Sequence, residues 1–245
     1  MEVDKNNLIH WLQELIRIPS VTGKEEAIAN FVSQELAKMG FLPQVKENNI
    51  FFEVGDGPKS LLLNAHLDTV DVGGDWKHDP FAAAMEDGKI YGRGASDDKG
   101  NIAAMLEIAR LLKDKQINGR MIFTFTTGEE FGAKLEKKGS YILSQFLKAE
   151  KALVLEPQND VDEKKVNIIY GCRGIENILV HIKGKASHTG YPVRGVNAIS
   201  KAVELLTKLE KLDFHKVMIA EKEIETICMP IRINGGAGIF LVPDK

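Results

Sequence analysis

The feature that most constrains the fold is an alternation of apolar, strand-like runs with helical segments over the first 155 residues. The predicted strands are residues 50–54, 60–66, 120–126 and 151–155. Apolar residues at helical spacing predict helices near residues 8–16, 27–36, 99–115 and 139–148. Strands that alternate with helices usually lie parallel, because each helix returns the chain to the same end of the sheet. The sequence therefore predicts an α/β fold with a largely parallel central sheet.

Two local patterns refine this prediction. The run Leu61-Leu62-Leu63 indicates a strand that is buried on both faces. Thr22 and Glu25 have the spacing of a capping box, in which each side chain binds a backbone N–H at the start of a helix. We therefore expect these two residues to open the second helix.

The strand and helix pattern restarts after Tyr170. Residues 175–184 and 224–233 alternate like strands, and residues 196–211 form an amphipathic helical pattern between them. This βαβ unit predicts a smaller α+β domain. We place the domains at residues 1–172 and 173–245. Because a lone βαβ unit leaves a sheet edge open, we expect the second domain to be incomplete.

Composition excludes several classes of function. The chain has 32 Lys and Arg residues against 35 Asp and Glu residues, a formal net charge of −3, so neither nucleic acid nor an anionic membrane is an expected partner. The N-terminus lacks the apolar core of a signal peptide, and no apolar run is long enough to span a bilayer. The only two cysteines, Cys172 and Cys228, lie far apart and suit a reducing compartment. We therefore expect a cytoplasmic protein.

Acidic side chains and one histidine gather where the predicted strands end. Taken singly, each has an ordinary explanation as a helix cap, a solvated loop or a strand exit. In an open parallel sheet, however, residues beyond the carboxyl ends of strands converge on one crevice. Clustered carboxylates repel one another, and a bound divalent cation is the simplest compensation. The residues concerned are His66, Asp68, Asp97, Asp98, Glu129, Glu130 and Glu156.

These residues stand in motifs that resemble those of the M20 metallopeptidase family. The match covers essentially the whole chain, and the motifs keep the family's order and separations. They are His66-Leu67-Asp68-Thr69-Val70, Trp76 with Asp79-Pro80-Phe81, Tyr91 to Gly100, Thr127 to Gly132, Leu155-Glu156-Pro157, and Ser187-His188 with Gly195 to Ile199.

The resemblance implies a zinc-peptidase-like catalytic domain that binds two zinc ions, for which Co²⁺ or Mn²⁺ could substitute. In that arrangement His66 and Glu156 bind one zinc ion and Glu130 binds the other. Asp97 bridges the two ions, and the peptide bond that follows it, to Asp98, is cis.

The resemblance also implies a reaction, the hydrolysis of an amide bond in an N-acyl amino acid or short peptide. Glu129 acts as the general base toward a metal-bridged water. Asp68 holds the His66 ring and fixes its tautomer. The resemblance further implies that the smaller domain is a dimerisation or lid domain through which homodimers form, and that His188 reaches the active site of the partner subunit.

Two features depart from the family pattern. Gly128 stands where many relatives have an aspartate, which should alter a supporting contact. Nothing in the chain matches the family's last zinc-binding histidine, so we expect a fragment that binds one zinc ion or none and has weak or absent activity alone.

Two other functions stay open at this point. A non-catalytic metal-binding module with the same fold is favoured by the missing histidine, whereas Glu129 favours an enzyme. A dinuclear phosphoesterase fits less well, because the chain carries all the M20-like motifs named above and no arginine-rich anion cradle accompanies them.

Overall fold

A computed structural model describes residues 2–130, 134–157, 168–169, 174–219 and 222–245. The chain divides into two compact units, Met1–Asn167 (unit 1) and Ile168–Lys245 (unit 2). The domain boundary predicted between residues 172 and 173 lies outside the described residues. Among the described helices, none combines the length and the apolarity that crossing a bilayer requires.

Unit 1 contains a five-stranded mixed sheet in the order β1-β2-β6-β3-β7. β3 pairs in parallel with β6 and with β7, whereas β2 pairs antiparallel with β6 and β1 antiparallel with β2. The predicted α/β class is therefore confirmed, with the parallel part confined to the β6-β3-β7 side. The strands are β1 (Gln44–Lys46), β2 (Asn49–Val54), β3 (Ser60–His66), β6 (Arg120–Thr126) and β7 (Lys151–Val154).

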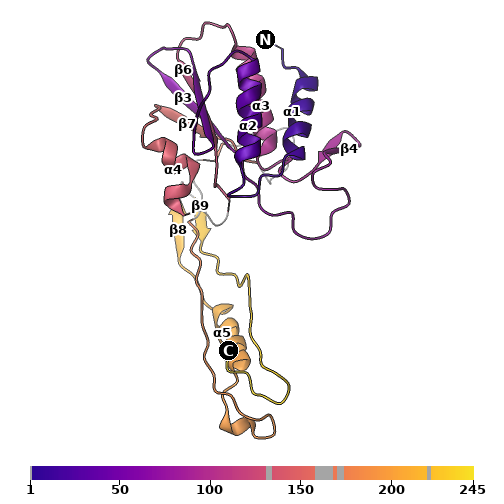
Figure 1. Cartoon of the computed structure of the whole chain (residues 1–245). Helices are drawn as coiled ribbons and strands as arrows, with labels where there is room; N and C mark the ends of the chain where they lie inside the picture. The colour runs from indigo at the N-terminus through magenta and orange to yellow at the C-terminus, as the bar shows by residue number, and fades with distance from the viewer. Residues whose placement is uncertain (1, 131–133, 158–167, 170–173, 220–221) are drawn as a thin grey trace. The chain divides into compact units, whose positions relative to one another are not determined.

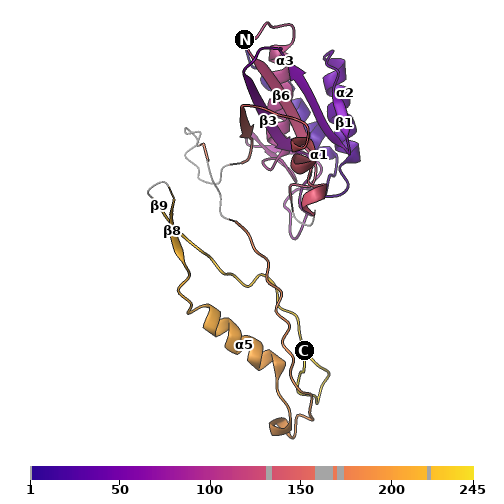
Figure 2. The ribbon, with the colours of Figure 1, turned by 90° about the vertical axis from the view of Figure 1, so that its left-hand side faces the viewer.

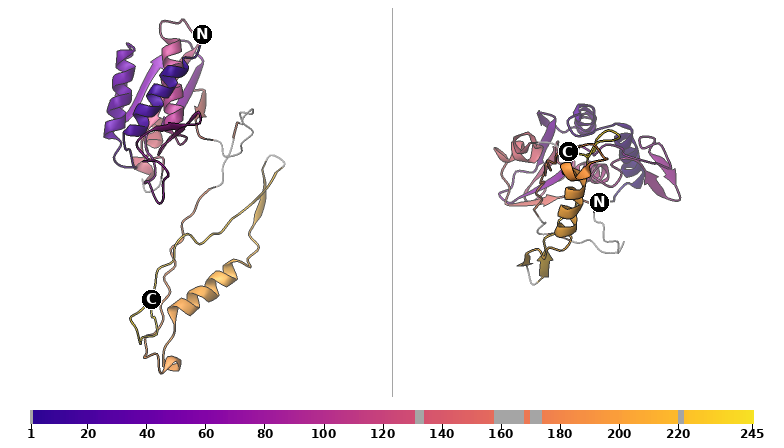
Figure 3. Two further views of the ribbon diagram at one scale, coloured as in Figure 1. Left: turned by 90° about the vertical axis from the view of Figure 1, so that its right-hand side faces the viewer. Right: turned by 90° about the horizontal axis from the view of Figure 1, so that it is seen from below.

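Three helices cover one face of this sheet (Figure 1; Figure 3, left). They are α1 (Lys5–Arg17), α2 (Glu26–Lys38) and α3 (Lys99–Leu112). The short helix α4 (Gly139–Ser144) follows a 3-10 turn, η1 (Leu135–Lys137), and lies on the opposite side (Figure 2). The connection from β3 to α3 carries a separate hairpin, β4 (Ala84–Glu86) with β5 (Lys89–Tyr91).

The core lies between the sheet and the three helices. Strand register puts Leu63 and Phe52 on either side of Phe123, and the Phe52 and Phe123 rings stack with their centroids 4.6 Å apart. All three side chains are buried in one cluster with apolar residues of α1, α2 and α3. Leu62 points to the other face and is only partly buried, so the prediction of a strand buried on both faces is wrong for this residue. Helices cover that face less completely.

Unit 2 contains one longer helix and one hairpin. The helix α5 (Ala198–Leu209) lies within the predicted range, after a 3-10 turn, η2 (Pro192–Arg194). The hairpin consists of β8 (Lys216–Ile219) and β9 (Lys222–Glu225), which pair antiparallel.

Two strand predictions in unit 2 are wrong. Residues 175–184 form no strand, and β9 covers only the first two residues of the range predicted at 224–233. Ile175, Leu179 and Ile231 are each more than three-quarters exposed. An alternating apolar pattern becomes a strand only when a neighbouring strand accepts its backbone hydrogen bonds, and the described residues supply none for these segments.

The stacked aromatic pair gives the first prediction. Replacing Phe123 by alanine should lower the free energy of unfolding by about 3–5 kcal/mol, because a fully buried ring would leave a cavity. Urea denaturation followed by tryptophan fluorescence measures this, since Trp11 and Trp76 both lie in unit 1. Leu42→Ala is the control, because Leu42 is 91% exposed and its loss should change the value by less than about 0.5 kcal/mol. Equal effects of the two changes would contradict this description of the core.

Candidate metal centre

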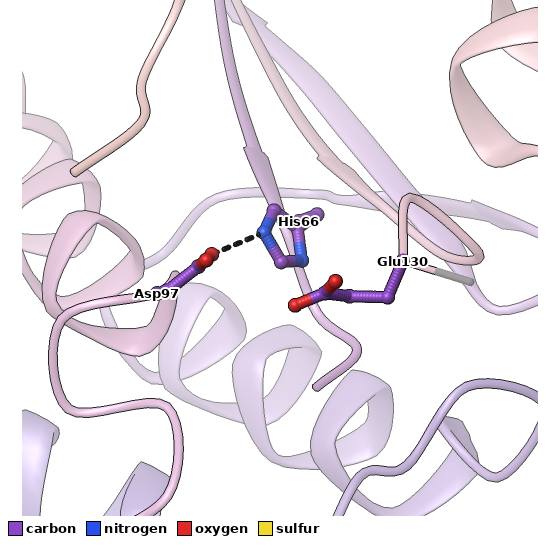
Figure 4. A group of neighbouring side chains, drawn as sticks. All are labelled: His66, Asp97 and Glu130. Carbon is purple, nitrogen blue, oxygen red and sulfur yellow. Dashed lines mark hydrogen bonds and ion pairs between the residues drawn. The ribbon is translucent and has the colours of Figure 1, made fainter. Parts of the chain in front are cut away.

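The parallel strands bring the predicted ligands to one edge of the sheet. His66 is the last residue of β3, and Glu156 follows β7 by two residues. Glu129 and Glu130 lie in the loop that follows β6, and Asp97 lies just before α3. Figure 4 shows His66 between Asp97 on one side and Glu130 on the other, each from a different element.

Two overlapping groups of side chains are close enough to hold a metal ion. In one group, ligand atoms of His66, Asp97 and Glu130 all lie within 4.8 Å of one another. In the other, the same holds for His66, Glu129 and Glu156. Imidazole and carboxylate are the donors that zinc accepts in hydrolases, so these residues fit a divalent cation. The structure thus gathers all four residues predicted as ligands, and it adds Glu129, predicted as the base, to one group.

His66 is held by three aspartates. Its ring is 1% exposed, its Nε2 lies 2.8 Å from Asp97 Oδ1, and its backbone N–H donates to Asp98 Oδ2 at 2.9 Å. Its Nδ1 lies 2.9 Å from the backbone oxygen of Asp68 and 3.5 Å from the Asp68 carboxylate. The ring nitrogen therefore faces both the main chain and the carboxylate of Asp68.

The crowded carboxylates change the proton affinity of the site. Burial by itself lowers the pKa of His66, but the hydrogen bond to Asp68 and the negative charges around the ring raise it to about 10. Burial, together with repulsion from Asp97, raises the pKa of Glu130 and of Glu156 above their ordinary values. Without a metal, bound protons therefore reduce the repulsion among the carboxylates. A bound cation would reduce the same repulsion and displace these protons.

The carboxylate of Asp68 organises the loop that carries the two glutamates. Its Oδ1 accepts the backbone N–H of Glu129 and its Oδ2 that of Glu130, both at 3.0 Å. The hydroxyl of Thr22 donates to the same Oδ2 at 2.8 Å. Burial alone raises the pKa of Asp68, but these bonds and His66 bring it below its ordinary value. Asp68 is thus a fixed, ionised acceptor for the glutamate loop.

This arrangement corrects the capping-box prediction. Helix α2 begins at Glu26, and its N-cap residue, Glu25, makes no side-chain capping bond. Thr22 binds Asp68, and the Glu25 carboxylate accepts the backbone N–H of Gly23. In a capping box the Thr22 hydroxyl would accept a backbone N–H of the helix, whereas here it donates to the Asp68 carboxylate. A hydrogen bond to an ionised acceptor is the stronger of the two.

Asp98 links two elements of the site, a role that the sequence analysis missed. The Asp97–Asp98 peptide bond is cis, as the resemblance implies. The Asp98 carboxylate is fully buried and accepts both the backbone N–H of His66 and the side-chain amide of Asn101. Burial raises the pKa of Asp98 to about 7 despite these bonds. Asp98 thereby ties the end of β3 to the first turn of α3.

Lys99, the first residue of α3, holds the same end of the helix in place. It is fully buried, its Nζ donates to the backbone oxygen of Ile18 at 2.8 Å, and its N–H donates to the oxygen of Gly94 at 2.9 Å. Burial lowers the pKa of its ammonium group to about 8. The start of α3 is thus fastened both to the end of α1 and to the loop before Asp97.

His188 lies in unit 2 and is exposed. Its Nδ1 accepts the backbone N–H of Gly190 at 3.0 Å, and its ring stacks against Phe240. Its backbone forms an isolated bridge with Leu241. The part assigned to it in a neighbouring site stays a prediction.

A family profile matches this arrangement of motifs. Peptidase family M20/M25/M40 matches residues 62–230, which is more than half of the chain. The chain belongs to this family. The matched range contains all seven residues predicted for the site, from His66 to His188.

Relatives of known sequence agree with this assignment. A succinyl-diaminopimelate desuccinylase of Orientia tsutsugamushi (strain Boryong) is 31% identical over 249 residues, which cover 95% of this chain and 63% of that protein. Carboxypeptidase G2 of Pseudomonas sp. (strain RS-16) is 36% identical over 220 residues, covering 84% of this chain and 51% of that protein. The chain thus spans less than two thirds of the length of these relatives.

Solved structures show the same fold. A tripeptidase from Staphylococcus aureus superposes with a TM-score of 0.68 and 24% identity, covering 99% of this chain and 64% of that one. An M20 family metallo-carboxypeptidase from Sulfolobus solfataricus has a TM-score of 0.66 and 24% identity, covering 84% of this chain and 50% of that one.

The raised pKa values predict how stability depends on pH. The contribution of His66 to the free energy of unfolding is fully present below its ordinary pKa of 6.5 and is lost as the pH rises toward 10. The contribution of Asp98 is lost as the pH rises from 3.8 toward 7. Without metal, the free energy of unfolding should therefore fall between about pH 6 and pH 8. A divalent cation such as zinc would compete with these protons, so its stabilising effect should grow over the same range.

Urea denaturation at several pH values, in a chelator and in excess zinc, measures both slopes. A metal-free protein that becomes more stable from pH 6 to pH 8 would show that the aspartates do not hold a proton on His66.

Proposed function

We propose that the protein acts in the zinc-dependent hydrolysis of an amide bond in an N-acyl amino acid or a short peptide. The observation that carries this proposal is the pair of overlapping ligand groups around His66, each with its ligand atoms within 4.8 Å. The family assignment supports it, and so do the names of the relatives. A desuccinylase, a carboxypeptidase and a tripeptidase are all named for the cleavage of an amide bond.

The residues proposed to hold zinc are His66, Asp97, Glu130 and Glu156. Asp97 lies within hydrogen-bonding distance of His66 and is half exposed, so its carboxylate would be available to hold a cation beside the ring and, in the proposed role, to bridge to a second one. Co²⁺ or Mn²⁺ accepts the same donors and would substitute. When bound, such ions polarise a carbonyl group and lower the pKa of a nearby water.

Glu129 is the proposed general base. Its carboxylate is exposed at the edge of the site, while Asp68 fixes its backbone N–H. It takes a proton from the attacking water as the new C–O bond forms, and it returns the proton to the nitrogen as the C–N bond breaks. The amine leaves neutral, and Glu129 is ionised again.

Zinc content and turnover test the function together. The 245-residue protein would be analysed for zinc and assayed against N-succinyl and N-acetyl amino acids, dipeptides and tripeptides, with and without a chelator. Hydrolysis that requires zinc would support the proposal, and the preferred acyl group would identify the substrate class. Binding of zinc without turnover would favour a non-catalytic metal-binding module. A protein that binds none of zinc, Co²⁺ and Mn²⁺ would refute both.

The variant Glu129→Gln separates a base from a ligand, since Glu129 also belongs to one ligand group. As a base it can be replaced without loss of zinc, and turnover should fall by roughly 10²–10⁴-fold because the amide cannot take a proton. Glu136→Gln, an exposed change in η1, is the matched control and should leave turnover unchanged. Loss of a zinc ion from Glu129→Gln would instead make this residue a ligand.

We also propose that two copies associate through unit 2 and that His188 completes the site of the partner subunit. Exposed apolar side chains of α5, among them Ile199 at 42% and Val203 at 55%, offer a contact surface.

Light scattering would measure the mass of the assembly. If His188 acts across the dimer, mixing and re-equilibrating inactive His188→Ala and Glu129→Gln proteins should restore activity, because one site of each mixed dimer is intact. No recovery in dimers that exchange subunits would place His188 outside the neighbouring site.

A further inference from the structure

Asn49 is a buried amide whose hydrogen bonds lead toward the glutamate loop. It is the first residue of β2 and is fully buried. Its Oδ1 accepts the backbone N–H of Thr127 at 2.8 Å and the Thr127 hydroxyl at 3.1 Å. Its Nδ2 donates to the backbone oxygens of Lys46 at 3.0 Å and Glu47 at 3.1 Å. The side chain thus uses both donors and both acceptor positions that an amide has.

The position of Asn49 in the sheet explains these bonds. The register of β2 and β6 sets Ile50 opposite Phe125, so Asn49 stands where the strand ladder ends. Thr127 is the first residue beyond β6, and its buried N–H needs an acceptor that no strand supplies. The amide of Asn49 takes the place of that strand. On the other side, the oxygen of Thr127 accepts the N–H of Gly139 at 2.8 Å.

Gly139, the first residue of α4, packs against the hydrogen bonds between Asn49 and Thr127, which we call the anchor. A Cβ at this glycine would lie 2.6 Å from the nitrogen of Thr127 and closer still to Oδ1 of Asn49. Any side chain would therefore displace one of the two groups. Because residue 139 has no side chain, the start of α4 packs directly against the hydrogen bond between Asn49 and Thr127.

The anchored residue leads at once into the metal centre. Gly128 follows Thr127 with a φ of +69°, which turns the chain toward Glu129 and Glu130. The N–H groups of those two residues bind Asp68. The loop is therefore held at its far end by Asp68 and at its near end by Asn49.

We propose that Asn49 is a positioning residue for the Glu129 and Glu130 pair, acting through Thr127. Asn49 makes no hydrogen bond to a proposed metal ligand. Its effect on the ligands comes from Thr127, whose position at the end of β6 it fixes. The consequence for metal binding rests on the proposed function, whereas the consequence for the loop does not.

Three variants test this in the full 245-residue chain. Asn49→Ala removes the anchor, and Gly139→Ala displaces it from the other side. Leu36→Ala is the control, because Leu36 is a fully buried core residue of α2 whose loss costs about 2–5 kcal/mol. Two quantities would be measured where all variants are folded: amide hydrogen exchange of residues 124–130 without metal, and the affinity for Co²⁺ by its visible absorption.

We expect Asn49→Ala and Gly139→Ala to speed exchange at residues 127–130 and to weaken Co²⁺ binding by roughly 10–100-fold, as losses of residues that support metal ligands do. Leu36→Ala should leave both quantities near those of the unsubstituted protein. Unchanged exchange or unchanged Co²⁺ affinity in Asn49→Ala would overturn the proposal, and so would equal losses in Leu36→Ala. If the unsubstituted protein binds no Co²⁺ while Asn49→Ala still loosens residues 127–130, the proposed metal function fails and the anchor stands.

Discussion

The parallel pairing of β3 with β6 and β7 is the constraint on which the site depends. It aligns three carboxyl ends at one edge of the sheet, so that His66, the glutamate loop and Glu156 meet although up to 90 residues separate them. The pairing is itself maintained by the apolar face that α1, α2 and α3 cover. Burial of Leu63 and Phe123 on that face therefore stabilises the same strands whose ends carry the chemistry.

Between the core and the ligands lies a layer of buried polar groups. Asp68, Asp98 and Asn49 each accept a backbone N–H from another element, and Lys99 donates to the backbone oxygen of Ile18. An unpaired polar group in this position would cost about 1–3 kcal/mol, so each bond restricts the backbone to one arrangement. The ligands themselves make few such bonds. Their geometry is set by neighbours that do not contact a metal, which is how crowded carboxylates stay together before a cation neutralises them.

Unit 2 shows the limit of reasoning from a local pattern. The helix α5 forms where its amphipathic spacing predicts, because a helix satisfies its own backbone hydrogen bonds. The segments at 175–184 and 226–233 have an equally regular alternation, yet they form no ladder within the described part of unit 2. A strand needs a partner, and the alternating pattern does not say which one. The same difference explains why β2, β3, β6 and β7, each with a described neighbour, were predicted correctly. The three-residue strands β1, β4 and β5 were not predicted.

The sequence by itself determined the α/β class, the four longer strands of unit 1 (β2, β3, β6 and β7) and the residues that gather at their ends, because periodicity and motif spacing are local properties. It also predicted the cis peptide after Asp97, through the resemblance of that motif. It assigned Thr22 to a helix cap, gave Asn49 no role and named no bonding partner for Asp98, since all three bind partners 32 to 78 residues away. Only the tertiary structure decided those partners. A polar side chain pairs with whatever unsatisfied group the packed backbone brings within reach, and no local pattern records where that group will be.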